Sequence, residues 1–176
     1  MARQQKAEIC DAAPAAEPVK SLFDRVAVYL DTHDWNYTAY QDKNYISTNC
    51  RFKEGSARVI VDVYEAEDWQ RVLVYTTLPV YVPELRRSAV TESITRINYK
   101  TMYGNLEMDL ADGEIRARTI AESDKCLSDS MIERVLDSNL GTVSRYFSPL
   151  LAVAFGNGAP ETVLDVAEKR DGATLQ

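Results

Sequence analysis

The chain has 176 residues, of which 45% are hydrophobic and 27% are charged, a composition typical of one globular domain with a core of its own. Asp and Glu number 27 against 20 Lys and Arg, so the formal net charge is −7. An acidic chain repels phosphate backbones and anionic membranes, and its basic residues are scattered among acids. We therefore expect neither nucleic-acid binding nor membrane binding.

Cysteine usage and hydropathy favour a cytosolic protein. The three cysteines, Cys10, Cys50 and Cys126, form no C-x-x-C pair, which disfavours a disulfide framework or a zinc site and favours reduced thiols. Residues 1–10 are too polar for the apolar part of a signal peptide. No stretch reaches the roughly 18–20 apolar residues that span a bilayer. We expect a cytoplasmic location.

Composition divides the chain into three parts. Residues 1–17 contain the run Ala-Ala-Pro-Ala-Ala and lack apolar periodicity, so they are predicted to be a disordered extension. Residues 18–157 carry the periodic patterns of a folded domain. Residues 158–176 are predicted to be a tail, in which residues 161–168 could form a short helix.

The N-terminal half of the domain changes from a helical to a strand period. Apolar residues at helical spacing predict a helix that begins after Pro18 and ends near His33. A period of two then predicts short strands over residues 37–40, 45–52, 58–64 and 71–78. Because the connections are short, we expect a three-strand antiparallel meander.

Two further helices flank a predicted hairpin. A helix over residues 84–102, ended by Gly104, is expected to bury the stripe Leu85, Ala89, Val90, Ile94, Ile97 and Met102. The last helix begins at the N-cap Ser128, and Pro149 is expected to bend or break it near Phe147. The chain is thus predicted to be an α+β protein of order α-βββ-α-ββ-α, with three helices on one face of an antiparallel sheet.

The sequence also predicts a register for the hairpin. Asp112-Gly113 is a favoured two-residue type I′ turn. Folding about it pairs Ala111 with Glu114, Leu110 with Ile115, Asp109 with Arg116, Met108 with Ala117, and Glu107 with Arg118. Acids then face arginines on one side of the hairpin, and the other side is apolar. A one-residue slip would destroy both patterns, which favours this register.

Apolar residues lie on both faces of the predicted meander. One face carries Val59, Val61 and Val63. The opposite face carries Ile60, Tyr64, Leu73 and Tyr75. Two explanations stay open for these last four residues: they are all core, or they form a protein-binding face of apolar residues rimmed by charge.

Six runs of sequence carry a family resemblance. They are Leu-Pro-Val-Tyr-Val-Pro at 78–83, Ile-Thr-Arg-Ile-Asn-Tyr at 94–99, Tyr-Gly-Asn at 103–105, Leu-Glu-Met-Asp-Leu at 106–110, Asp-Gly-Glu-Ile-Arg at 112–116 and Ser-Arg-Tyr-Phe at 144–147. Together they resemble the YbjN-like bacterial family, often labelled sensory transduction regulators, over about residues 22–155. The resemblance implies a fold similar to type III secretion chaperones, small α+β proteins that commonly form homodimers and bind other proteins. It transfers no catalytic residue, cofactor or ligand. By analogy with that fold, a homodimer contact is expected at Val90, Ile94 and Ile97.

Residues that invite chemistry have simpler explanations. His33, the single histidine, lies at a helix end, where the negative end of the dipole favours it, and no G-x-S-x-G motif is present. Glu65, Glu67 and Asp68 could hold a metal, but they match no EF-hand pattern and suit a solvated turn. Strand tyrosines could stack on RNA, but such modules normally have a basic groove. We expect no catalytic residue, metal or cofactor.

The function expected from sequence is therefore a non-enzymatic, protein-binding regulator or chaperone-like adaptor. It would form a homodimer and bury an apolar segment of an unidentified protein partner against its sheet. The alternative is a small-ligand sensor or an enzyme with an unrecognised pocket. A deep pocket with converging polar groups would favour the alternative, and a broad apolar face would favour the regulator.

Overall fold

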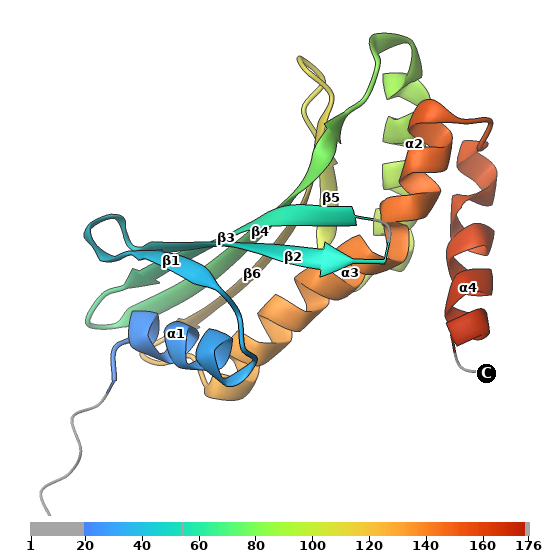
Figure 1. The fold of residues 1–176 in the computed structure, drawn as a ribbon. Helices are drawn as coiled ribbons and strands as arrows, with labels where there is room; N and C mark the ends of the chain where they lie inside the picture. Colours follow the sequence, from blue (N-terminus) through green and yellow to red (C-terminus); the bar gives the residue numbers. More distant parts are fainter. Residues whose placement is uncertain (1–19, 54, 175–176) are drawn as a thin grey trace, which may run out of the picture.

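The computed structural model describes residues 20–53 and 55–174, so the predicted extension over residues 1–17 lies outside the described residues. The described residues form four α-helices and one six-stranded antiparallel sheet (Figure 1), which confirms the predicted α+β class. In chain order the elements are α1 (Leu22–Thr32), β1 (Tyr37–Tyr40), β2 (Tyr45–Phe52), β3 (Gly55–Glu65), β4 (Trp69–Tyr81), α2 (Glu84–Lys100), β5 (Asn105–Met108), β6 (Glu114–Asp124), α3 (Asp129–Phe155) and α4 (Val163–Thr174).

The sheet has the strand order β1-β2-β3-β4-β6-β5. All four strands predicted before α2 are present, but they form a meander of four strands instead of the predicted three, because β1 also pairs with β2. Asn44 adopts a left-handed conformation with φ of +54° after a short 3-10 turn, and the chain folds back so that Tyr40 lies opposite Tyr45. Asparagine tolerates this conformation better than most residues. The tail contributes a helix, α4, that is longer than the predicted residues 161–168.

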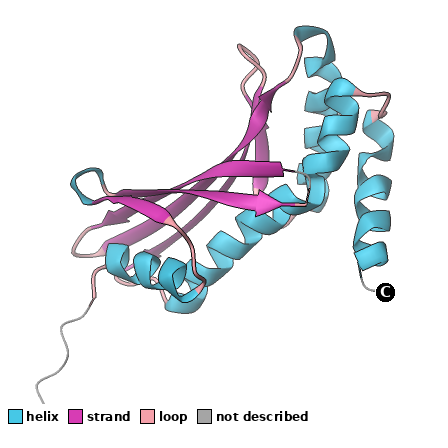
Figure 2. Cartoon of the chain, viewed as in Figure 1, coloured by secondary structure: helices cyan, strands magenta, loops and turns pink. Residues whose placement is uncertain are grey.

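The two faces of the sheet differ. Figure 2 shows α1 and α3 along one face, while α2 and α4 stand beside one end of the sheet. Residues that point toward α1 and α3 alternate with residues that point away. The first set is buried from Ala57 to Val63 in β3 and from Gln70 to Leu78 in β4. The buried set includes Val59, Val61, Val63, Val72 and Val74. We call the other face the open face, because its side chains keep part of their surface in solvent.

The long helix α3 covers the core. Ser128 is its N-cap, as predicted, and its hydroxyl accepts a hydrogen bond from the Met131 N–H at 3.3 Å. The helix continues through Pro149 without a break. Figure 1 shows that its C-terminal part turns away from the direction of the rest. Pro149 lies in that part and supplies no N–H to the helical ladder, which explains a bend at this place.

Helix α2 buries only half of the predicted stripe. Val90, Ile94 and Ile97 are buried, but Leu85 is 96% exposed and Met102 is 84% exposed. Leu85 precedes Val90 by five residues, a spacing that places it on another side of the helix. Met102 lies beyond the last helical residue, Lys100. The prediction was wrong for these two residues.

The predicted hairpin register was also wrong. Met108 pairs with Ile115, Glu107 with Arg116 and Leu106 with Ala117, so the ladder is shifted by two residues and the loop is longer than the two-residue turn. Two carboxylates stabilise this loop: Asp109 accepts the Ala111 N–H at 2.7 Å, and Asp112 accepts the Glu114 N–H at 2.8 Å. A slip of two residues keeps every side chain on its face, so the polar and apolar alternation does not distinguish the two registers.

Candidate functional site

The four residues singled out from sequence lie together on the open face. Ile60 lies opposite Tyr75, and Tyr64 lies opposite Arg71, while Leu73 faces Asp62 across the same pair of strands. All four keep some exposure, and Tyr64 is 44% exposed. The described helices do not cover them, so the first of the two open explanations, that all four are core, does not describe this face.

One end of the open face is built around Arg71. Its guanidinium carbon lies 5.7 Å from the centre of the Tyr64 ring and 5.6 Å from that of Trp69, and the two rings are 5.0 Å apart. Arg71 also forms an ion pair with Asp62 at 3.0 Å, while its buried Nε has no hydrogen-bond partner among the described residues. Cation–π contact and the ion pair together hold these flat groups side by side.

The opposite end of the open face carries a second arginine–aromatic pair. The Arg116 guanidinium carbon lies 4.6 Å from the centre of the Tyr75 ring. The Glu107 carboxylate forms ion pairs with Arg116 at 2.9 Å and with Arg118 at 2.8 Å. Arg58 occupies the same cross-strand row as Arg116, with Thr77 between them. An apolar centre is thus flanked by guanidinium groups, the residue types enriched at protein interfaces.

Sequence reasoning missed the arginines and Trp69 as members of this face. Trp69 lay outside the predicted strand 71–78, and Arg71 acquires its neighbour Tyr64 from the register of β3 with β4. Arg116 and Arg118 reach Tyr75 only through the pairing of β4 with β6, which are separated by α2 and β5. The period-two pattern could have found the arginines of β6, because it places Arg116, Arg118, Ile120 and Glu122 on one side of that strand.

The predicted dimer residues lie elsewhere. Val90 and Ile97 have no exposed surface, and Ile94 is 7% exposed, because α2 packs these side chains within its own protomer. They are therefore not available at the surface of the described chain. A homodimer through α2 stays a prediction, and it would need outward residues of that helix, such as Leu85 or Tyr99, which are 96% and 86% exposed.

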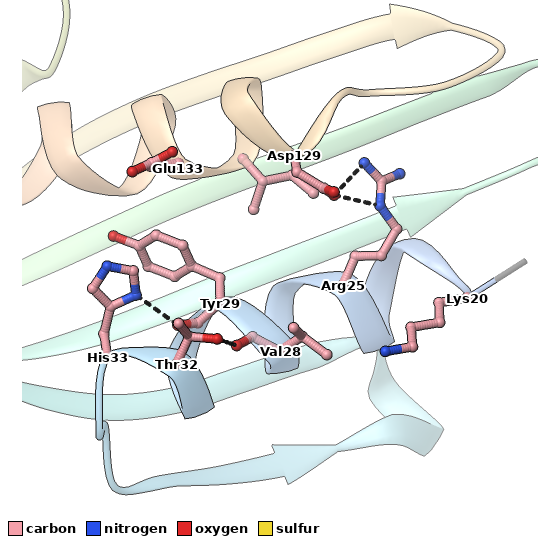
Figure 3. Close-up of a pocket in the computed structure, with 9 residues that line it drawn as sticks. Lys20, Arg25, Val28, Tyr29, Thr32, His33, Asp129 and Glu133 are labelled. Carbon is pink, nitrogen blue, oxygen red and sulfur yellow. Dashed lines mark hydrogen bonds and ion pairs between the residues drawn. The ribbon is translucent and has the colours of Figure 1, made fainter.

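A hollow with a volume of about 400 Å³ lies between α1 and α3 (Figure 3). His33 lies here at the end of α1, where its Nδ1 is 2.8 Å from the Tyr29 carbonyl oxygen and its ring packs 4.3 Å from that of Tyr29. Tyr29 donates a hydrogen bond to Asp137 at 2.6 Å. Burial, with a smaller effect of Asp137, raises the pKa of the Tyr29 hydroxyl and keeps it protonated. The histidine therefore has the helix-end environment that the sequence predicted.

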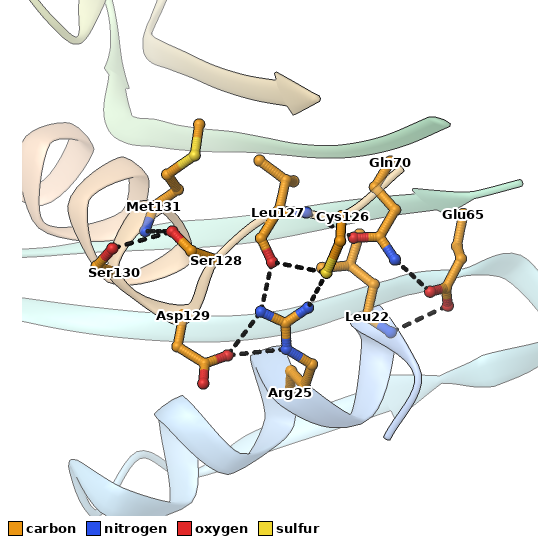
Figure 4. Close-up of polar contacts among 10 residues, drawn as sticks. All are labelled: Leu22, Arg25, Glu65, Gln70, Cys126, Leu127, Ser128, Asp129, Ser130 and Met131. Carbon is orange, nitrogen blue, oxygen red and sulfur yellow. Dashed lines mark hydrogen bonds and ion pairs between the residues drawn. The ribbon is translucent and has the colours of Figure 1, made fainter. Parts of the chain in front are cut away.

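The polar groups beside this hollow join elements rather than converge on an empty centre (Figure 4). Arg25 of α1 binds Asp129 through Nε at 2.8 Å and also donates to the Leu127 carbonyl oxygen. The Glu65 carboxylate accepts the Leu22 N–H at 2.9 Å, which caps the start of α1. Gln70 donates to the same carboxylate and accepts the Leu127 N–H. This network fixes α1 against the sheet and α3.

Metal-ligating side chains do not gather within residues 20–53 and 55–174: no group of three or more His, Cys, Asp or Glu residues could hold an ion there. In the acid cluster of the sequence, Glu65 takes part in the network described above. The same described residues contain no helix of sufficient length and apolar character to cross a bilayer.

The fold and the open face define a class: an α+β protein whose antiparallel sheet has helices on one face and a partly exposed apolar face on the other. A family model matches residues 22–152, and the chain belongs to this family, YbjN, whose description is "Putative bacterial sensory transduction regulator". The family predicted from sequence is confirmed. A comparison with curated proteins found no match.

Proposed function

We propose that this protein is a non-enzymatic regulator that binds a partner protein through the open face of its sheet. The observation that carries the proposal is the strip formed by Ile60, Tyr64, Leu73 and Tyr75, which no described helix covers and which guanidinium groups flank. The family description supports a role in signal transduction. The proposed location is the cytoplasm, and the proposed YbjN-like domain is residues 18–157, against which α4 packs through the buried Val163 and Ala167.

The chemistry of the strip favours protein over small-molecule binding. Flat aromatic and guanidinium groups lie on a sheet surface, where they offer a broad contact area and little enclosure. The hollow between α1 and α3 supports the alternative function, a small-ligand sensor, but its ionised groups Arg25 and Asp129 already bind each other at 2.7 Å. We therefore place the regulator first and the sensor second.

The test is capture of partners from lysate by the tagged protein, followed by mass spectrometry. The double variant Tyr64→Asp, Tyr75→Asp places two charges in the strip and should lose the specific partner, because a buried unpaired carboxylate is costly. The conservative variant Tyr64→Phe, Tyr75→Phe should retain it. Phe155→Asp is the matched control, since Phe155 is 55% exposed on α3 and lies outside the sheet.

Far-UV circular dichroism and thermal melting establish that each variant is folded. Loss of one partner in the double Asp variant, with retention in both comparison variants, supports the proposal. Equal capture by all folded variants, or no specific partner at all, contradicts it and directs attention to small ligands in the hollow beside His33. Light scattering of the free protein tests the proposed homodimer separately.

A further inference from the structure

Strand β6 is longer than its outer neighbour. β5 pairs with β6 only from Ile115 to Arg118, so within the described part of the chain no strand lies beside the remaining residues up to Asp124 on that edge. The direction of the backbone groups follows from the ladder. The Glu114 carbonyl oxygen accepts a bond from the Asp109 N–H on the β5 side, and backbone groups alternate along a strand. Ile120 and Glu122 therefore direct their N–H and C=O groups outward from this edge.

A groove runs along this unpaired edge. Its first part, with a volume of about 280 Å³, lies between β6 and α3 and contacts Ile120, Met131 and Val135. A second hollow of about 440 Å³ lies farther along α3, beside the end of α2. Tyr103 and Ser138 line both parts, so the two hollows adjoin. Backbone groups that need partners and an apolar groove beside them are the two requirements of strand addition.

Large apolar side chains that are exposed gather at the same place. Tyr103 is 53% exposed, Ile120 52% and Met131 39%, although they come from three different parts of the fold. Met102, in the second part of the groove, is 84% exposed. Such side chains would lose this surface to an added strand, and that burial supplies the main driving force for binding.

The groove is cationic although the chain is acidic. Lys100, Arg134 and Arg145 line it against a single acid, Glu122, while the whole chain has a formal net charge of −7. Arg134 takes part in none of the side-chain ion pairs or hydrogen bonds among the described residues. This charge favours an acidic occupant. A second copy joined edge to edge by a two-fold axis would instead bring the cationic groups of both protomers together.

We propose that the edge of β6 and the adjoining groove bind an extended, acidic segment of a partner protein. The segment adds a strand beside Ile120 and Glu122, its apolar side chains enter the groove, and its carboxylates lie near Arg134 and Lys100. The groove lies on the α3 side of β6 and the strip lies on the open face, and the two surfaces meet at Ile120, which is opposite Leu73. The inference does not depend on whether that strip binds a partner.

The test uses the full chain and two synthetic probes of about eight residues, the length of a typical strand. One probe alternates Glu with Val, and its counterpart alternates Lys with Val. Binding is followed by fluorescence, and the exchange of individual amide protons is followed by NMR. At a concentration of the acidic probe about 100 times its Kd, exchange of the Ile120 and Glu122 amides should slow by up to about 100-fold. The basic probe should bind more weakly.

Charge reversal identifies the groove. Arg134→Glu should lower the affinity for the acidic probe by about fivefold or more and raise the affinity for the basic probe. Lys43→Glu is the matched control, because it changes the net charge by the same amount in the turn between β1 and β2, outside both parts of the groove. It should leave both affinities nearly unchanged.

Three results would overturn the proposal. The first is binding of the acidic probe without slower exchange at Ile120 and Glu122. The second is an equal loss of affinity for this probe in Arg134→Glu and Lys43→Glu. The third is exchange at these two amides that slows with protein concentration in the absence of a probe, since a second copy would then occupy the edge. If the Tyr64 and Tyr75 variants show no loss of a partner in the capture experiment, none of these three results is affected.

Discussion

The Asn139 side chain accepts a hydrogen bond from the Thr76 hydroxyl at 2.5 Å in the centre of the core, where neither residue has exposed surface. The amide of Asn139 also donates to the Val74 carbonyl oxygen and to the Thr119 hydroxyl, each at 3.1 Å. One side chain of α3 thus satisfies polar groups from β4 and β6. It fixes the position of the helix across the two strands whose pairing assembles the open face.

We therefore expect Asn139→Ala to lower the free energy of unfolding by about 2–4 kcal/mol, because it leaves buried hydroxyl groups without partners. Urea denaturation measures the change. Ser138→Ala, one residue earlier on the same helix, should change stability by no more than about 0.5 kcal/mol, since Ser138 is partly exposed and its side chain makes no such bond. Equal effects of the two variants would contradict this role of Asn139.

Two glycines should respond oppositely to alanine. Gly113 has φ of +86°, and a Cβ there would lie 2.3 Å from the Val82 carbonyl oxygen. Gly113→Ala should therefore cost at least about 1–2 kcal/mol from the backbone conformation alone. Gly141 lies inside α3, and a Cβ there would have no atom of the described residues within 4 Å. Gly141→Ala should stabilise the fold by about 0.5–1 kcal/mol. Thermal and urea unfolding of both variants would reveal a wrong sign in either.

The hairpin register can be measured through its charges. Glu107 pairs with Arg116 in the structure, whereas the register predicted from sequence pairs Asp109 with Arg116. A double-mutant cycle with alanine at Glu107 and Arg116 should give a coupling of about 0.5–1 kcal/mol, the range for partly exposed ion pairs. The matched cycle with Asp109 and Arg116 should give a coupling near zero. A larger coupling energy for Asp109 with Arg116 than for Glu107 with Arg116 would favour the register predicted from sequence.

The two described cysteines should differ in reactivity. Burial raises the pKa of the Cys50 thiol from its ordinary 9.0 to about 11, whereas Cys126 is exposed. Two double variants each keep one of these thiols: Cys10→Ser, Cys50→Ser keeps Cys126, and Cys10→Ser, Cys126→Ser keeps Cys50. At pH 8, iodoacetamide should modify Cys126 much faster than Cys50, because the thiolate is the nucleophile. Similar rates in the folded proteins, with urea-unfolded samples as reference, would contradict this.

The raised pKa of Cys50 also predicts how the free energy of unfolding changes with pH. A group with a raised pKa binds its proton more tightly in the folded state than in the unfolded state. The contribution of Cys50 to stability is therefore complete below pH 9.0 and is lost as the pH rises to about 11. Replacing Cys50 with Ala should remove this part of the alkaline loss of stability, which urea unfolding at several pH values measures.

Local patterns determined much of this protein. The periods of 3.6 and two placed the main helices and strands, Ser128 marked the start of α3, and alternation assigned Ile60, Tyr64, Leu73 and Tyr75 to one face. These features depend on neighbours within a few residues, so the sequence contains them directly. The runs that resemble YbjN-like proteins identified the family for the same reason, since they are local as well.

Tertiary structure decided the relationships between distant segments. The hairpin register depends on the contact of Gly113 with Val82 and on two carboxylates in the loop, and alternation is unchanged by a slip of two residues. The partners of Asn139, the arginines beside Tyr75 and the groove along β6 all require β4 to lie beside β6. That pairing joins segments separated by α2 and β5, and its free energy comes from burial of the assembled core, which no single segment encodes.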